Sequence, residues 1–131
     1  MGAAPFLAPL MTTLLYGIPN CDTVKKARTW LSAHEQDATF HDFKKQDLTR
    51  DVVSAWLEQL DWTVLVNRKG STWRNLDEAH KAGVQDAASA LELMLASPSV
   101  IKRPVLATGG RYHVGFSDAQ YRLIFNLSDR P

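Results

Sequence analysis

The sequence predicts an α/β fold with a mixed sheet, on three observations. A strand, helix and strand follow one another over residues 14–43. Helical apolar patterns then fill an insert of about residues 48–97, and a strand pair with a glycine turn leads into a last helix. The predicted order is therefore β-α-β, helical insert, β-β-α.

The first part of this order begins with a short apolar strand at residues 14–18, which the turn residues Pro19-Asn20 end. A helix follows from about Cys21 to about residue 34, because apolar residues recur at three- and four-residue spacing: Val24, Ala27 and Leu31. Residues 38–43 are rich in β-branched and aromatic side chains and form the second strand. A strand-helix-strand unit predicts that these two strands are parallel.

The insert begins with Thr49, a residue suited to cap a helix, followed by an apolar stripe at helical period over residues 52–60. Residues 71–82 and 86–96 predict two further helices, which Gly83 separates.

The last third contains a predicted hairpin with strands at 104–108 and 111–115 and a Gly109-Gly110 turn. Ser117 and Gln120 have the spacing of a capping box, which predicts a final helix to about residue 126. A parallel pair joined to an antiparallel hairpin, with helices before and after, is the order of the thioredoxin fold.

The length of 131 residues suits one domain, which we place at residues 14–131. Residues 1–13 are expected to be an extension; no Lys or Arg precedes their apolar stretch, and two prolines interrupt it, against a secretory signal. No apolar run approaches the roughly 20 residues that a membrane span needs. We therefore expect a cytoplasmic protein without membrane association.

Composition excludes several classes of function. A net charge of +1 supplies no basic surface for nucleic acid. The single cysteine excludes internal disulfides and a Cys-rich zinc site, and the four histidines have no metal-ligand spacing. We expect neither a metal nor a tightly bound cofactor.

The single cysteine is the candidate nucleophile. Cys21 is predicted at the first turn of a helix, where backbone N–H groups and the helix dipole favour the thiolate over the thiol. Lys25 lies one turn further on and can bring its ammonium toward the sulfur. The alternative is that Cys21 is a small buried hydrophobic residue, as many lone cysteines are.

Two basic segments are candidate anion-binding sites: Asn67-Arg68-Lys69-Gly70 and Lys102-Arg103-Pro104. The planar guanidinium of arginine suits carboxylates and oxyanions. Taken alone, each segment is more typical of a solvated basic loop than of a binding site.

Residues 15–27, with Gly17-Ile18-Pro19-Asn20-Cys21-Asp22-Thr23-Val24-Lys25-Lys26-Ala27, resemble the active-site segment of the ArsC family, the glutaredoxin-coupled arsenate reductases and their relatives. Residues 67–70 and 101–104 resemble the second and third motifs of that family, in the same order, and the likeness spans about residues 13–126. The small YffB-type proteins are the most similar branch.

This resemblance implies a thioredoxin-like fold and a catalytic thiolate at Cys21, which Asn20 and Lys25 support. It implies that Arg68 and Arg103 bind a substrate oxyanion or glutathione, beside a cis Pro104. It also implies glutathione as co-substrate, with glutaredoxin as a further partner.

Two departures from the resemblance narrow the function. The arsenate reductases carry a third arginine about a dozen residues after the Arg-Pro motif, where this chain has residues 112–116 without one. The related Spx regulators carry a Cys-x-x-Cys redox pair, whose second position here is Val24.

The sequence therefore predicts a glutathione-dependent thiol reductase that acts on a disulfide or another small oxidised substrate. With one cysteine, a second thiol must come from another molecule. An Spx-like regulator without enzymatic activity is the alternative, and an arsenate reductase is the third possibility.

Overall fold

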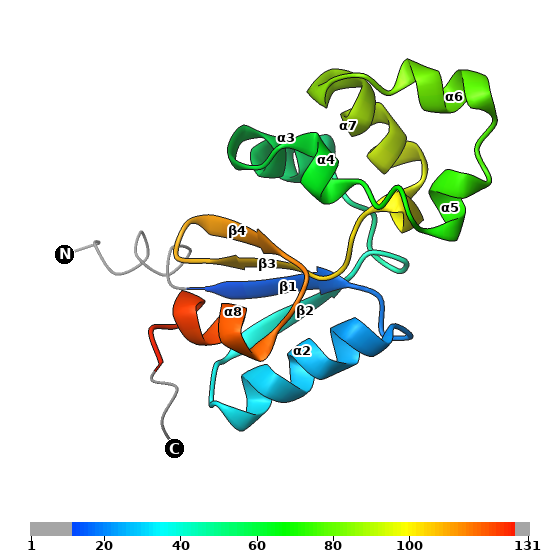
Figure 1. Ribbon diagram of the computed structural model, residues 1–131. Helices are drawn as coiled ribbons and strands as arrows, with labels where there is room; N and C mark the ends of the chain where they lie inside the picture. Colours follow the sequence, from blue (N-terminus) through cyan, green and yellow to red (C-terminus); the bar gives the residue numbers. More distant parts are fainter. Residues whose placement is uncertain (1–11, 128–131) are drawn as a thin grey trace. The chain divides into compact units, whose positions relative to one another are not determined.

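The computed structural model describes residues 12–127 (Figure 1). The chain divides into two compact units, the first formed by residues up to 41 together with those from 103 onward, the second by residues 42–102. The predicted helical insert lies inside the second unit. The assignment of residues 14–131 to one domain stays a prediction. The extension predicted at residues 1–13 lies almost wholly outside the described residues.

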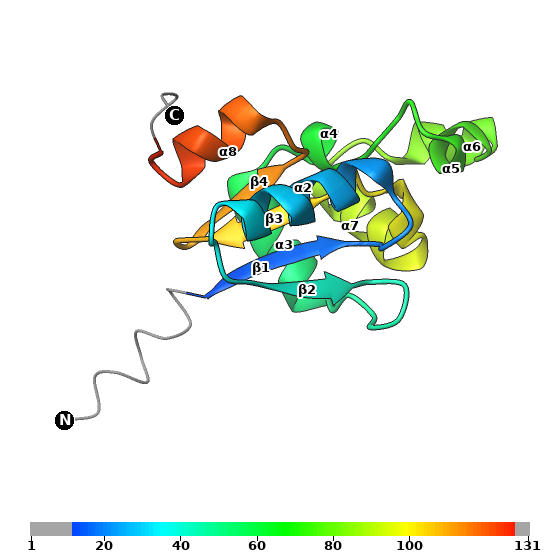
Figure 2. The same ribbon diagram turned by 90° about the horizontal axis from the view of Figure 1, so that it is seen from below.

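The first unit contains a four-stranded sheet in the order β2-β1-β3-β4. Its strands are β1 (Thr13–Gly17), β2 (Ala38–Asp42), β3 (Val105–Thr108) and β4 (Arg111–Val114). Strand β3 pairs antiparallel with both β1 and β4, and the arrows of β1 and β2 point the same way in Figure 2. The predicted mixed sheet, with its parallel pair and its hairpin, is confirmed.

Two helices of the first unit, α2 (Asp22–Ala33) and α8 (Asp118–Ile124), cover the same face of this sheet (Figures 1 and 2). Between them and the sheet lies a core to which both helices, β1 and β3 contribute: Leu15, Ala27, Trp30, Leu31, Leu106 and Tyr121. Burial of a large apolar side chain contributes about 1.5–3 kcal/mol, so this cluster holds α2 firmly on the sheet. That matters for function, because α2 begins at Cys21.

The second unit is helical. Its helices are α3 (Arg50–Gln59), α4 (Trp62–Leu65), α5 (Ser71–Arg74), α6 (Glu78–Gly83), α7 (Ala87–Ala96) and the 3-10 turn η1 (Pro98–Val100). Backbone pairing joins the segment after α4 to the end of the unit: Val66 pairs with Ile101, and the N–H of Lys102 donates to the carbonyl of Leu65. This pairing holds the chain immediately before Arg103.

The predicted caps are largely confirmed. The Thr49 hydroxyl accepts from the N–H of Val52, and the Ser117 hydroxyl accepts from the N–H of Gln120. The capping box at Ser117 is only half formed, because the Gln120 side chain donates to the carbonyl of Val114 instead of returning to Ser117. Both turn glycines have positive φ, as their turn requires.

Two predicted helices differ from the structure, and one helix was not predicted. The single helix expected over residues 71–82 is two helices, because the Asp77 carboxylate accepts from the N–H of His80 and starts a new helix there. The last helix ends at Ile124, not near residue 126. The short helix α4 was not predicted; its start is the Asp61 carboxylate, which accepts from the N–H of Thr63. Within residues 12–127, no helix has the length and apolar character needed to cross a membrane.

Candidate active site around Cys21

The site begins where β1 passes into α2. Gly17 ends β1, and a methyl group at this position would come within 2.8 Å of a methyl carbon of Val24 in the first turn of the helix. Val24 is fully buried. The absence of a side chain at Gly17 therefore lets the start of α2 pack directly onto the end of the strand.

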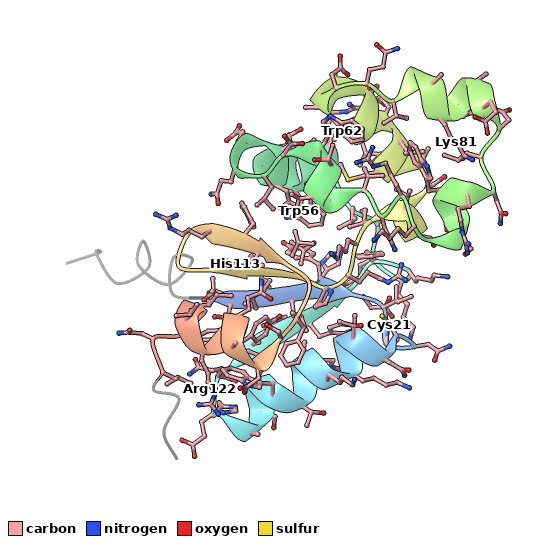
Figure 3. The ribbon with its side chains drawn as sticks, viewed as in Figure 1. Cys21, Trp56, Trp62, Lys81, His113 and Arg122 are labelled. Atoms are coloured by element: carbon pink, nitrogen blue, oxygen red, sulfur yellow. The ribbon has the colours of Figure 1, made fainter. Side chains whose placement is uncertain are left out.

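Cys21 occupies the position immediately before α2, as predicted (Figure 3). Its backbone is extended (φ −145°, ψ 122°), and its carbonyl accepts the first helical hydrogen bond from the N–H of Lys25 at 2.9 Å. The thiol is partly exposed, and Cys21 is free of any disulfide. This position leaves the N–H groups of the first turn facing the sulfur.

Arg103 lies two residues before β3, the neighbour of β1 in the sheet, and its side chain forms a hydrogen bond with the thiol of Cys21. The β1–β3 register pairs Tyr16 with Val105, so its continuation sets Arg103 opposite Ile18, just before the turn that carries Cys21. The peptide bond between Arg103 and Pro104 is cis, as the resemblance implied. Pro104 is buried directly before β3, not within the strand as predicted.

The pKa of the Cys21 thiol is lower than its ordinary value. Partial burial raises the pKa, but the N–H of Val24, the guanidinium of Arg103 through a hydrogen bond and its charge, and the N–H of Thr23 together outweigh that effect. Both the helix start and Arg103, which the sequence assigned to an oxyanion, therefore lower the pKa of the thiol; a catalytic role of Cys21 stays a prediction. The result is a partly exposed sulfur with an enlarged thiolate fraction at neutral pH.

Asn20 and Lys25 flank the cysteine and are both exposed. Neither appears among the groups that lower the pKa of Cys21. Their supporting role therefore stays a prediction.

Arg68 lies in the second unit, in a loop closed by Asn67. The Asn67 side chain accepts from the N–H of Lys69 at 3.2 Å, and the N–H of Gly70 donates to the Asn67 carbonyl. The Arg68 guanidinium lies over the Trp62 ring, 5.6 Å from its centroid. Its charge also contributes to a lowered pKa of Asp61, after the N–H and the hydroxyl of Thr63. Arg68 therefore has aromatic and acidic neighbours within its own unit, and its contact with substrate stays a prediction.

The described part of the chain contains no group of three or more His, Cys, Asp or Glu side chains arranged to hold a metal ion.

Comparison with known proteins identifies the family to which this chain belongs. The model of the ArsC family matches residues 16–124, which include Cys21, Arg68 and Arg103. The chain belongs to the ArsC family.

Relatives within and around this family support the assignment over nearly their whole length. An uncharacterized protein from Haemophilus influenzae is 40% identical over 111 residues, 85% of this chain and 96% of the relative. The global transcriptional regulator Spx of Streptococcus pyogenes is 26% identical over 123 residues, 92% of this chain and 89% of the regulator.

Solved structures agree. A protein described as YffB is 51% identical with a TM-score of 0.82, covering 86% of this chain and 97% of its own. An arsenate reductase-related protein from Brucella melitensis is also 51% identical, with a TM-score of 0.70 and coverage of 89% and 97%. The thioredoxin-like ArsC fold predicted from the sequence is confirmed.

Proposed function

We propose that this ArsC-family protein is a glutathione-dependent thiol reductase in which Cys21 is the only nucleophile. The observation that carries the proposal is the pairing of a partly exposed thiol of lowered pKa with Arg103 at a helix start. A structural cysteine needs neither activation nor exposure, whereas a nucleophilic one needs both.

In the proposed cycle, the Cys21 thiolate attacks one sulfur of a disulfide substrate. The new sulfur-sulfur bond forms as the substrate bond breaks, and the departing thiolate takes a proton from solvent. Because the chain has one cysteine, a glutathione thiolate then attacks the Cys21 sulfur of the mixed disulfide. The bond to the substrate breaks, and the second substrate thiolate leaves and takes a proton. Once Cys21 carries glutathione, a second glutathione releases oxidised glutathione and restores the thiolate.

The other site residues have proposed roles in this cycle. Arg103 stabilises the Cys21 thiolate in the resting protein. It stabilises the same thiolate again when the second glutathione displaces the Cys21 sulfur as the leaving group. Lys25 and Asn20 support the same charge from α2 and from the turn before it. Arg103 with the backbone at Pro104, and separately Arg68, are proposed to bind glutathione or the substrate. Glutaredoxin is a proposed alternative to free glutathione as reductant, and a cytoplasmic location, where glutathione is reduced, stays a prediction.

The test is turnover of 2-hydroxyethyl disulfide with glutathione, coupled to glutathione reductase. Cys21→Ser should abolish the catalysed rate, because a hydroxyl is a poor nucleophile at neutral pH. Mass spectrometry of the wild-type protein after exposure to oxidised glutathione should show one glutathione per chain, attached at Cys21. Retained turnover in the Cys21→Ser variant would contradict the proposal.

A second candidate function is that of an Spx-like regulator, which the similarity to the Spx of Streptococcus pyogenes favours. Such a protein binds a partner instead of turning over a substrate. Capture from a cell extract separates the two: stoichiometric RNA polymerase subunits would favour the regulator. The second position of the Cys-x-x-Cys pair is the fully buried Val24, so this chain lacks the redox pair of those regulators.

A further inference from the structure

A groove of about 450 Å³ lies in the first unit, at the end of the sheet away from Cys21. Four of its lining residues come from the β3–β4 hairpin and two from the last turn of α8: Thr108, Gly109, Arg111, His113, Leu123 and Ile124. In Figures 1 and 2, the turn of this hairpin, the last turn of α8 and the start of β1 lie at the same end of the sheet. The groove therefore lies at the end of the sheet where β1 begins.

The register of the sheet places the hairpin side chains of the groove on the face that α8 covers. Leu106 belongs to the core under α2 and α8, and alternate residues of a strand point to the same face, so Thr108 points there too. Arg111 is the partner of Thr108 in β4 and shares its face. His113 likewise shares the face of its partner Leu106. The groove thus continues the core of the first unit toward the surface.

An uncovered apolar side chain lines this groove. Leu123 is 83% exposed, the more exposed of the two large apolar side chains that stand exposed within residues 12–127. Burial and the charge of Arg111 lower the pKa of His113, so this imidazole is mostly neutral at pH 7. Arg111 is itself exposed and can keep its guanidinium in water. The groove therefore suits an apolar occupant.

The chain that precedes β1 supplies such an occupant beside the groove. Thr13, the first residue of β1, is buried, and its hydroxyl shares a hydrogen bond of 2.8 Å with the hydroxyl of Thr108. Residues 1–11 read Met-Gly-Ala-Ala-Pro-Phe-Leu-Ala-Pro-Leu-Met and contain no charged side chain. A chain covers at most about 3.6 Å per residue, so the three residues before Thr13 can span about 11 Å. This tether gives the segment a high effective concentration at the groove.

We propose that the apolar segment of residues 1–11 docks in this groove and covers Leu123 and Ile124. The segment following α8, residues 128–131, reads Ser-Asp-Arg-Pro; it is polar, and its arginine is repelled by Arg111. A second copy of the chain would need about 20–30 residues on each side for a stable interface, whereas six residues line the groove. The tethered apolar segment is therefore the occupant that the groove favours.

Cleavage by chymotrypsin after Phe6 measures the docking, because the protease acts on the fraction of molecules in which the segment has left the groove. Full-length protein and a synthetic peptide of residues 1–14 are digested side by side, and mass spectrometry follows the cut at Phe6. The protein should be cut about tenfold more slowly than the peptide, the factor that burial of one large apolar side chain gives.

Matched variants on α8 test the groove itself. Leu123→Glu places a charge among the lining residues and should restore the cleavage rate of the free peptide. Ala119→Glu adds the same charge one turn earlier on α8, outside the groove, and should leave the protection unchanged. Both side chains are exposed, so the fold should tolerate the two substitutions. Circular dichroism and alkylation of Cys21, both unchanged, serve as the controls for a folded first unit.

The outcomes decide between the possible occupants. Equal cleavage of protein and peptide would overturn the proposal, and so would protection that persists in Leu123→Glu, since the segment would then bind elsewhere. Light scattering after size exclusion tests for a second copy: a dimer that becomes a monomer in Leu123→Glu would contradict the proposal. None of these measurements depends on turnover, so they stand apart from the test of the proposed reductase function.

Discussion

The thiol of Cys21 is controlled by two different kinds of neighbour. The backbone N–H groups of Thr23 and Val24 act as soon as the helix starts, and the Arg103 guanidinium adds a charge brought from a distant part of the chain. The N–H groups belong to the backbone and survive any substitution that keeps the helix. Only the arginine can therefore be removed cleanly.

Replacement of Arg103 by Gln should raise the pKa of Cys21 and slow its alkylation by iodoacetamide at pH 7 by about tenfold, since a hydrogen bond to a charged group contributes about 1.5 kcal/mol or more. In the wild-type protein the rate should reach its plateau at a lower pH than for a thiol titrating at the ordinary 9.0. Arg122→Gln, which removes a guanidinium from α8, is the control. An unchanged pH profile in Arg103→Gln would show that the guanidinium does not act on the sulfur.

Tyr121 supplies a second prediction at the scale of the residue. Its side chain is fully buried, and within residues 12–127 its hydroxyl has no hydrogen-bond partner. Burial raises the pKa of Tyr121 above the ordinary value of 10.0. A raised pKa means that the unfolded chain loses this proton first as the pH rises, so the contribution to stability is complete below pH 10 and declines above it.

Tyr121→Phe should therefore leave the free energy of unfolding at pH 7 unchanged or raise it by about 1 kcal/mol, because an unpaired buried hydroxyl is removed while the ring contacts remain. Above pH 10, the free energy of unfolding should also fall less steeply in the variant than in the wild-type protein. Urea unfolding at pH 7 and at pH 11 measures both effects. A loss of more than about 1 kcal/mol at pH 7 would indicate that the hydroxyl has a partner in solution.

At the scale of the element, the junction of β1 and α2 is the sensitive point. Gly17 and Val24 lie so close that an added methyl group must displace the first turn of α2 or the end of the strand. The same turn provides the N–H groups that face the thiol. Packing at Gly17 and reactivity at Cys21 are therefore coupled.

Gly17→Ala should destabilise the protein by about 1–3 kcal/mol, as overpacking does, and should raise the pKa of Cys21 by shifting the helix start. Gly83→Ala is the matched control. It adds the same methyl group at the end of α6, where nothing lies within 4 Å, and should be neutral or slightly stabilising. Thermal unfolding and alkylation rates, measured on both variants, test the coupling. Normal alkylation in a destabilised Gly17→Ala protein would argue against it.

At the scale of the whole molecule, the fold by itself does not determine the activity. The arsenate reductase of Vibrio cholerae has a TM-score of 0.70 but only 12% identity with this chain, a likeness that shows the fold alone. Activity toward arsenate then depends on the site residues. The stretch where the resemblance expects a third arginine, residues 112–116, contains none.

We therefore expect little or no arsenate reduction in an assay with arsenate, glutathione and glutaredoxin, since a multiply charged oxyanion needs several cationic partners. Turnover of 2-hydroxyethyl disulfide by the same preparation is the control for active protein. Arsenate turnover at a rate comparable with the disulfide rate would contradict the expectation and restore arsenate as a substrate.

The local features of this protein could be predicted from its sequence because they depend on neighbours in the chain. The helix start at Cys21, the Thr49 cap and the glycine turn of the hairpin are all of this kind. The break at Asp77 and the start of α4 at Asp61 also depend on neighbours, but an apolar pattern outweighed a single capping carboxylate in the prediction. Recognition of those caps would have found both helices.

The single cysteine, its place before a helix and the need for an external thiol follow from the sequence alone, because covalent order and residue count determine them. The contact between Cys21 and Arg103 does not, because 82 residues of chain separate the two. It depends on the register of β1 with β3, which only the packed sheet decides.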